Sequence, residues 1–186
     1  MLLGDRRVID WSRDTAHSVS DGVVLVVPAE AATAEAGVAG GATRSESVRR
    51  GLAAVPSDAT IICVHDAARP FASEHLYRDV IGAVAAGADG AVPGLPVTDT
   101  IKKVNTDGIV LDTPDRAALM AIQTPQAFRA SVLREAHEAG NEGTDDASLV
   151  ERAGGKVVVV NGEAINRKLT NPEDLEWARA MAATEI

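Results

Sequence analysis

The chain has 186 residues, of which 46% are apolar and 24% are charged, a balance that suits one ordinary globular domain with a sizeable core. Its 27 acidic and 18 basic side chains give a formal charge of −9. This charge argues against general binding to nucleic acid or to an anionic membrane, because both need a basic surface.

The first residues lack the apolar stretch of a signal peptide, and no run of about 18 apolar residues occurs elsewhere. We therefore expect a cytoplasmic protein. The single cysteine, Cys63, lies in the apolar run 61–64, so we expect a buried, unreactive thiol. With only four scattered histidines beside it, the sequence offers no zinc site.

Short β-branched runs alternate with longer helical patterns along the chain, which is typical of a parallel α/β sheet. The predicted elements, in chain order, are a helix at 8–17, a strand at 23–27, a helix at 45–54, a strand at 61–64, a helix at 74–86, a weaker strand at 90–93, helices at 128–139 and 145–153, a strand at 156–160 and a helix at 172–183. The strand at 23–27 shows no polar alternation, as expected for a strand covered on both faces.

Three helix starts carry capping signals, one of them Thr144 before Asp145 and Asp146. Thr43 followed by Glu46 fits a capping box, in which each side chain satisfies an amide near the start of the helix. Asn171 followed by Pro172 gives an N-cap and a proline in the first turn. These signals predict helices that begin close to residues 44, 145 and 172.

The stretch 98–116 interrupts the alternation. Strand-like runs at 100–104 and 109–111 flank Asn105-Thr106-Asp107-Gly108, and Asp-Gly is a strong hairpin signal. A polar hairpin has little core to cover, so we expect it to project. Without repeats or a linker, the sequence predicts a single domain over 1–186 with an arm at about 98–117.

A histidine, an aspartate and an arginine directly follow the predicted strand 61–64. Ligands of open α/β sheets bind at the carboxyl ends of strands. Asp66 is placed to bind Mg²⁺ together with phosphate oxygens, and Arg69 to pair with phosphate or to fix the loop. The alternative is that Asp66 caps the next turn and that Arg69 is a solvated or structural ion-pair residue. Position alone leaves both open.

Three further segments carry weaker signals. Gly40 and Gly41 lead a turn into a helix, where anions bind well and a ligand can approach the backbone, although a plain turn also explains them. The segment 123–126 follows the apolar run 119–122 at a predicted strand end, with a proline-stopped strand as the alternative. Lys168 precedes the last helix, where a solvated lysine is the alternative.

Five segments follow one another along the chain: His65-Asp66-Ala67-Ala68-Arg69-Pro70, Pro96-Val97-Thr98-Asp99-Thr100-Ile101-Lys102, Gln123-Thr124-Pro125-Gln126-Ala127-Phe128, Thr144-Asp145-Asp146-Ala147-Ser148 and Lys168-Leu169-Thr170-Asn171-Pro172-Glu173-Asp174. Their order and approximate spacing resemble the methylerythritol phosphate cytidylyltransferases, from about Leu3 to the last helix. The related ribitol 5-phosphate cytidylyltransferases share the His-Asp and Gln-Thr-Pro-Gln segments, whereas Lys102 favours the methylerythritol branch.

The resemblance implies a Rossmann-like nucleotidyltransferase fold with a mostly parallel central sheet, flanking helices and a projecting β-hairpin arm. It implies transfer of CMP from CTP to 2-C-methyl-D-erythritol 4-phosphate, a step of isoprenoid-precursor synthesis, with Mg²⁺ as cofactor. A phosphate oxygen of the sugar alcohol would attack the α-phosphorus of CTP and release pyrophosphate. A homodimer is also implied, because the arm of this family embraces a second subunit.

The resemblance further implies a role for individual residues. The residues implied to bind the nucleotide are Gly40, Gly41, Ser47, Asp66, Ala67 and Arg69, with Mg²⁺ on Asp66. Those implied to bind the sugar-alcohol phosphate are Thr100, Arg116, Thr124 and Lys168, of which Thr100 and Arg116 would serve the partner's site. Those implied to act in catalysis are Asp66, Arg116 and Lys168.

The start of the sequence departs from the family pattern. Family members begin with an apolar strand, a glycine-rich loop with an arginine and a Pro-Lys pair, whereas residues 1–10 here match the segment that follows. We therefore expect an N-terminally incomplete domain. Three explanations stay open: a start assigned too late, a genuinely short chain that is catalytically weak or is a silent dimeric binding protein, and a replacement strand from a partner chain.

Overall fold

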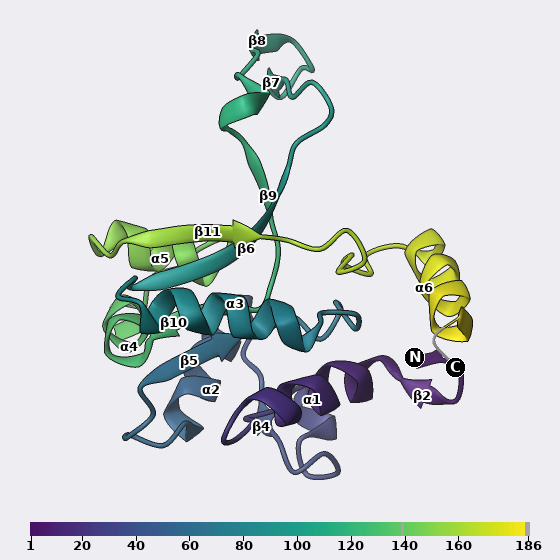
Figure 1. The fold of residues 1–186 in the computed structure, drawn as a ribbon, viewed down its shortest axis with the longest axis vertical. Helices are drawn as coiled ribbons and strands as arrows, with labels where there is room; N and C mark the ends of the chain where they lie inside the picture. Colours follow the sequence, from purple (N-terminus) through teal and green to yellow (C-terminus); the bar gives the residue numbers. More distant parts are fainter. Residues whose placement is uncertain (139, 185–186) are drawn as a thin grey trace.

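The computed structural model describes residues 1–138 and 140–184, which form a mixed β-sheet with helices on both faces and one projecting arm (Figure 1). The sheet runs in the order β11 (Val157–Asn161), β6 (Gly90–Pro96), β10 (Gln126–Arg129) and β5 (Ile61–Val64), and β9 (Met120–Ile122) pairs with the far end of β6. β11 is parallel to β6, whereas β10 is antiparallel to both β5 and β6. The carboxyl ends of β5, β6 and β11 therefore lie at one edge of the sheet.

The predicted α/β class is confirmed, and the sheet is mixed rather than mostly parallel because β9 and β10 both pair antiparallel to their neighbours. The sequence pattern hid β10, since Gln126–Arg129 continues into α4 (Ala130–Glu138) without a turn residue between them. Phe128, predicted to begin a helix, instead lies fully buried in the middle of the sheet. The last residue of that predicted helix, 139, lies outside the described residues.

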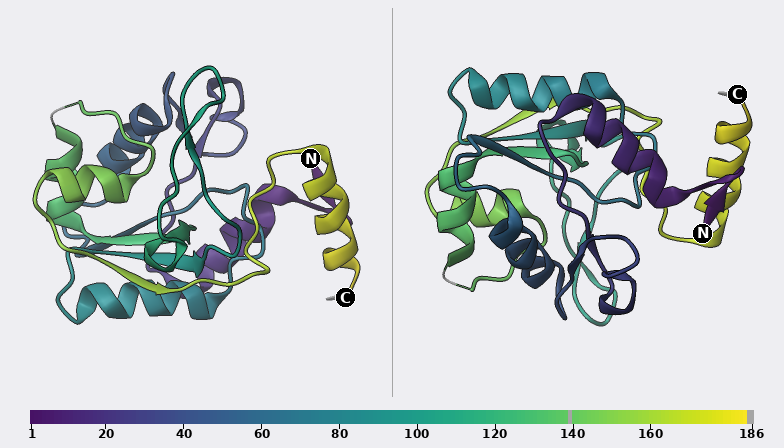
Figure 2. Two further views of the ribbon diagram at one scale, coloured as in Figure 1. Left: turned by 90° about the horizontal axis from the view of Figure 1, so that it is seen from above. Right: turned by 90° about the horizontal axis from the view of Figure 1, so that it is seen from below.

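The two faces of the sheet carry alternate side chains of each strand, as the pleat requires. One face packs against α4 and α5 (Asp146–Arg152), and the other packs against α3 (Glu74–Ala85), with α1 (Val8–Val19) beside α3 (Figure 2). The strand residues of the first face include Ile62, Val92 and Phe128, and those of the second include Cys63, Ala91 and Ala127.

A second, smaller pair of strands lies outside the main sheet. β3 (Val26–Val27) and β4 (Val38–Ala39) are parallel and pack against α2 (Arg44–Ala54); between them lies a 3-10 turn at Ala29–Ala31. The prediction of a strand at 23–27 covered on both faces is wrong: only Val26–Val27 is a strand, and only Val27 of the run is buried. A two-strand pair with a helix on one side does not cover both faces.

The caps predicted at Thr43 and Asn171 are confirmed, with the Glu46 half of the capping box displaced to Ala42, whereas α5 is capped by Asp145 and not by Thr144. Thr43 Oγ1 accepts a hydrogen bond of 3.1 Å from the Glu46 amide, while the Glu46 carboxylate accepts one of 2.7 Å from the Ala42 amide. At α6 (Pro172–Thr184), Asn171 Oδ1 accepts a bond of 2.9 Å from the Asp174 amide. α6 packs against the hairpin of β1 (Leu2–Leu3) and β2 (Arg6–Arg7), so the last helix lies beside the first residues of the chain (Figure 1).

The hairpin arm stands well clear of the sheet (Figure 1). Its strands, β7 (Lys103–Val104) and β8 (Val110–Asp112), are antiparallel, and a 3-10 turn at Arg116–Ala118 leads back to β9. β7 is shorter than the predicted run 100–104, and β8 is displaced by one residue from the predicted run 109–111. Asn105 Oδ1 accepts bonds from the amides of Asp107 (3.1 Å) and Ile109 (2.8 Å), and Gly108 has a φ of 79°. The Asp-Gly signal thus predicted the turn correctly.

Over residues 1–138 and 140–184, no helix combines the length and the apolar character that crossing a bilayer requires.

Candidate functional site

The site is built around Asp66, which follows β5 at the carboxyl edge of the sheet. Thr124, between β9 and β10, lies beside it: the Asp66 amide donates a hydrogen bond of 3.0 Å to Thr124 Oγ1. Asn166, after β11, donates from Nδ2 to the Thr124 carbonyl at 2.9 Å. Three strand ends are therefore fastened together at this edge, as expected for a ligand site in an open α/β sheet.

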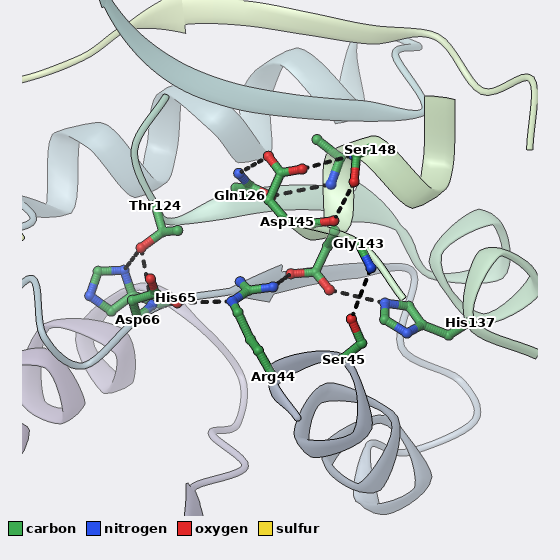
Figure 3. Close-up of polar contacts among 12 residues, drawn as sticks. Arg44, Ser45, His65, Asp66, Thr124, Gln126, His137, Gly143, Asp145 and Ser148 are labelled. Atoms are coloured by element: carbon green, nitrogen blue, oxygen red, sulfur yellow. Dashed lines mark hydrogen bonds and ion pairs between the residues drawn. The ribbon is translucent and has the colours of Figure 1, made fainter. Parts of the chain in front are cut away.

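His65 supports this arrangement as a neutral ring. Burial lowers the pKa of His65 to about 4, so the ring carries one proton at neutral pH. Its Nε2 lies 3.1 Å from the Arg69 carbonyl, which can only accept, so Nε2 carries that proton. Nδ1, 3.1 Å from Thr124 Oγ1, therefore accepts the proton of the threonine hydroxyl (Figure 3).

Two cations meet the carboxylate of Asp66. Lys168 Nζ is 2.7 Å from Oδ2, and Arg44 Nε is 3.4 Å from Oδ1. Partial burial alone would raise the pKa of Asp66, but the hydrogen bond from Lys168 and the charges of both cations outweigh it and hold the pKa below its ordinary value. Asp66 is thus an ionised carboxylate at neutral pH, with a lysine that is 43% exposed beside it.

Arg44 joins three elements at once. From the first turn of α2 it reaches Asp66 with Nε (Figure 3), and its Nη1 lies 2.8 Å from Oδ2 of Asp146 at the start of α5. Asp146 is buried and lies 3.0 Å from Nε2 of the equally buried His137. Burial would lower the pKa of Arg44, but the carboxylates of Asp146 and Asp66 raise it above its ordinary value.

The Arg69 guanidinium hydrogen-bonds backbone carbonyls of two other segments. Its Nη1 donates to the Asn166 carbonyl at 2.8 Å and its Nη2 to the Ile122 carbonyl at 3.4 Å. The Leu169 amide donates to the Ala68 carbonyl at 2.8 Å. These bonds tie the loop after β5 to the segment after β11, which is what places Lys168 at Asp66. Burial lowers the pKa of Arg69 from its very high ordinary value.

The glycine-led turn before α2 has a close-packed backbone. The Gly41 amide donates to Ser47 Oγ at 3.0 Å, and Ser47 Oγ donates to the Thr43 carbonyl at 2.9 Å. A Cβ at Gly41 would lie 2.3 Å from Glu46 side-chain atoms, and one at Gly40 would lie 3.1 Å from Ser47 Oγ. Arg44, which follows this turn, links it to Asp66 through their ion pair.

The arm places two of the expected site residues far from this cluster. Thr100 and Arg116 are exposed, and Arg116 Nη1 donates to the Thr98 carbonyl at 2.6 Å. Within one chain, the structure therefore brings together Asp66, Thr124 and Lys168 and leaves the arm residues apart (Figure 1). Ala67, by contrast, lines a hollow of about 400 Å³ beside the cluster, together with Ala68 and Leu169.

A protein-family model described as IspD: 2-C-methyl-D-erythritol 4-phosphate cytidylyltransferase matches residues 4–184. The match covers nearly the whole chain. The chain belongs to the 2-C-methyl-D-erythritol 4-phosphate cytidylyltransferase family.

Relatives in this family are similar over different shares of their length. The cytidylyltransferase of Nocardia farcinica is 47% identical over 166 residues, which is 89% of this chain and 70% of the relative. That of Prochlorococcus marinus is 44% identical over 179 residues, 94% of this chain and 79% of the relative. A bifunctional IspD/IspF enzyme of Nitratidesulfovibrio vulgaris is 53% identical over 142 residues, so this chain matches only 36% of that relative's length.

Solved structures of the family share the fold. The 4-diphosphocytidyl-2C-methyl-D-erythritol synthase of Anaerococcus prevotii superposes with a TM-score of 0.89 at 31% identity, over 98% of this chain and 88% of that one. The cytidylyltransferase of Thermus thermophilus superposes with a TM-score of 0.86 at 36% identity, over 98% and 92%. These matches confirm the nucleotidyltransferase fold predicted from the sequence.

The cluster contains one cation, Arg44, that lies outside the five family segments and was not among the expected site residues. Arg44 is the only cation in the segment 40–47, and it stands directly after the capping Thr43. Its partner Asp146 belongs to the acidic start of α5. The spacing of 102 residues between the two hid their pairing, because only the fold brings them together.

A metal site made by the protein alone is absent from the described residues: no three His, Cys, Asp or Glu side chains gather there closely enough to hold an ion. Asp66 is therefore a single carboxylate donor. Mg²⁺ is commonly bound by one or two carboxylates plus substrate phosphates and water, so this donor set fits a Mg²⁺ ion that shares its ligands with a triphosphate.

Proposed function

We propose that this chain transfers CMP from CTP to 2-C-methyl-D-erythritol 4-phosphate, giving 4-diphosphocytidyl-2-C-methyl-D-erythritol and pyrophosphate. Family membership supports the reaction. The observation that carries it in this chain is the meeting of Lys168 and Arg44 at the Asp66 carboxylate, at the carboxyl edge of the sheet. In a chain with a formal charge of −9, this local pair of cations suits a phosphorylated ligand.

The reaction is a displacement at phosphorus. A phosphate oxygen of the sugar alcohol forms a bond to the α-phosphorus of CTP, while the bond from that phosphorus to the bridging oxygen breaks and pyrophosphate leaves. No covalent enzyme intermediate is needed, so catalysis comes from orientation and from stabilising the developing negative charge. Lys168, exposed enough to meet a ligand, supplies a cation where that charge develops.

Mg²⁺ belongs to this proposal as the divalent cation. Asp66 would hold it together with triphosphate oxygens, and the ion would supply charge neutralisation at the phosphates. The low pKa of Asp66 keeps the carboxylate ionised and ready to bind a cation over the whole neutral range. Lys168 and Arg44 would then be free to turn from the carboxylate toward phosphate oxygens.

The remaining roles follow the family pattern. We assign Gly40, Gly41, Ser47, Ala67 and Arg69 to the surroundings of the nucleotide, with Arg69 acting mainly by fixing the loop. We assign Thr124 and Lys168 to the sugar-alcohol phosphate of the same subunit, and Thr100 and Arg116 to that of a partner subunit.

We also infer a homodimer formed through the arm, in the cytoplasm. Four apolar side chains of the arm are more than half exposed: Val104 (52%), Ile109 (61%), Val110 (52%) and Leu111 (59%). A cluster of exposed apolar groups of this kind is typical of an interaction surface. A second copy of the chain covering them would also bring Arg116 to its partner's site.

The test is pyrophosphate release by the purified chain with CTP, Mg²⁺ and methylerythritol phosphate, run in parallel with ribitol 5-phosphate. We expect product with methylerythritol phosphate only, a loss of about 10²-fold or more in Asp66→Asn, and no change in Asp58→Asn, an exposed aspartate before β5. Equal or faster pyrophosphate release with ribitol 5-phosphate would contradict methylerythritol phosphate as the specific substrate. A folded protein that releases no pyrophosphate with either substrate would contradict the enzymatic proposal and would favour a catalytically silent binding protein.

A further inference from the structure

His65 stands beside Asp66 but takes no part in the chemistry proposed above. Both of its ring nitrogens are hydrogen-bonded inside the protein, Nε2 to the Arg69 carbonyl and Nδ1 to Thr124 Oγ1, each at 3.1 Å. The ring of Tyr77 packs against it with 5.5 Å between centroids. No nitrogen of His65 is left to bind a substrate or a metal, so its contribution must pass through its neighbours.

The hydrogen bonds of His65 form a directed chain. The Arg69 carbonyl can only accept, so Nε2 donates to it. Nδ1 therefore accepts a hydrogen bond from the Thr124 hydroxyl, and the oxygen of that hydroxyl accepts a hydrogen bond of 3.0 Å from the Asp66 amide. The direction therefore runs from the Asp66 amide to Thr124, from Thr124 to His65, and from His65 back to the loop that carries Asp66.

This direction limits what Thr124 can do. A threonine hydroxyl has one proton and two lone pairs, and here the proton and one lone pair are in use. Thr124 can offer a ligand only its remaining lone pair. It would therefore accept a hydrogen bond from a hydroxyl group of the sugar alcohol and would not donate one to a phosphate oxygen.

We propose that His65 is a positioning residue that, through the Thr124 hydroxyl, fixes the backbone at Asp66 and so holds its carboxylate between Lys168 and Arg44. Without an acceptor for its proton, the Thr124 hydroxyl is free to rotate, and its lone pair no longer faces the Asp66 amide. The carboxylate would then lose its fixed place relative to both cations. This inference rests on the proposed function for its kinetic consequence, but its hydrogen-bond pattern can be tested alone.

The first test needs no activity. In ¹⁵N spectra of protein labelled in the histidine rings, His65 should be the neutral tautomer with Nε2 protonated and Nδ1 unprotonated. In Thr124→Val, the Nδ1 resonance should shift because its hydrogen-bond donor is gone. A His65 ring protonated at Nδ1, or one that does not respond to Thr124→Val, would overturn the proposal whatever the enzyme does.

The second test is a double-mutant cycle on kcat/KM for CTP. His65→Phe keeps the ring volume and should lower kcat/KM about tenfold, the effect of one well-placed hydrogen bond. Thr124→Val should cost at least as much, and the double variant no more than the larger single loss, because both break the same chain. His65→Asn, whose Oδ1 can replace Nδ1 as an acceptor, should recover most of the loss. His75→Phe, at a histidine that is 79% exposed, is the matched control and should leave kcat/KM unchanged.

The outcomes separate the two proposals. If the unsubstituted chain makes no product, the proposed function fails and the ¹⁵N spectra alone decide about His65. If the chain is active and the losses of His65→Phe and Thr124→Val simply add, or His65→Asn is as impaired as His65→Phe, the positioning role is wrong. Thermal unfolding of each variant identifies any loss that comes from misfolding.

Discussion

Lys168 Nζ lies 2.7 Å from Oδ2 of Asp66, although the two residues are 102 positions apart in the sequence. The contact depends on backbone ties between their loops, the Leu169 amide to the Ala68 carbonyl and the Arg69 guanidinium to the Asn166 carbonyl, both at 2.8 Å. The chain thus holds a carboxylate and a cation in one place at the edge of the sheet.

Replacing Lys168 should impair the reaction more than the fold. In Lys168→Met the cation is lost where negative charge develops, so we expect kcat/KM to fall about 10²-fold or more. The side chain is 43% exposed, so the ion pair itself adds little to stability, and the melting temperature should change by no more than about 2 °C. Initial rates and thermal unfolding measure the two effects.

Lys156→Met is the control for Lys168→Met, because Lys156 is an exposed lysine at the start of β11. A Lys168→Met enzyme that keeps its full rate would contradict the role of Lys168. An equal loss in Lys156→Met would mean that overall charge, rather than this position, explains the result.

Replacing Asp146 should destabilise the protein. Its carboxylate is 1% exposed and accepts from both Arg44 and His137. Asp146→Ala therefore leaves the buried His137 Nε2 without an acceptor and removes one of the two carboxylates that pair with Arg44, which keeps Asp66. We expect a loss of about 3 kcal/mol in the free energy of unfolding, measured by urea titration. Asp14→Ala is the comparison: that carboxylate is 56% exposed in its pair with Arg6, and its loss should cost less than about 0.5 kcal/mol. Equal effects of the two substitutions would argue that Asp146 has no special place in the structure.

The thiol of Cys63 should be slow to react in the folded protein. Burial raises its pKa from an ordinary value of 9.0 to about 12, so little thiolate forms at pH 8. Alkylation by iodoacetamide should be at least about 100-fold slower in the native protein than in urea, followed by mass spectrometry. Because the folded-state pKa is the higher one, this neutral thiol should favour folding below pH 9 and lose that effect as pH rises towards 12. Equal alkylation rates with and without urea would contradict the burial of this side chain.

Local sequence signals predicted caps and turns better than they predicted the surroundings of a strand. Val23 to Val27 and Ile61 to Val64 are both apolar runs, yet only the second is a strand of the main sheet. Periodicity reports that a segment is apolar, and which neighbours cover it depends on the rest of the fold. Thr43, Asn171 and Gly108 were predictable because caps and tight turns depend on a few adjacent residues.

The site was predictable in its parts but not in its connections. Asp66 follows a recognisable strand, so its place at the edge of the sheet followed from the pattern. Arg44 gave no comparable signal, since its partners Asp66 and Asp146 lie 22 and 102 positions away. Contacts at such separations depend on the packing of α2 and α5 around the sheet, which a single sequence does not display. β10 was missed for a similar reason, because its residues continue directly into a helix.

Arg116 should act in the site of the partner subunit. If the arm of one subunit serves the site of the other, Arg116→Ala and Asp66→Asn should each be inactive as homodimers and should complement one another when mixed. A mixed dimer then contains one site with an intact Asp66 and an intact Arg116 from its partner. Equal amounts exchanged to equilibrium should restore about a quarter of the unsubstituted activity, because half of the dimers are mixed and each has one working site of two. Sedimentation equilibrium establishes the dimer, and Ile109→Asp, which places a charge on the exposed apolar surface of the arm, should reduce both dimerisation and complementation. If Arg116 instead served its own subunit, every site in the mixed dimer would lack one of the two groups, and mixing would restore nothing.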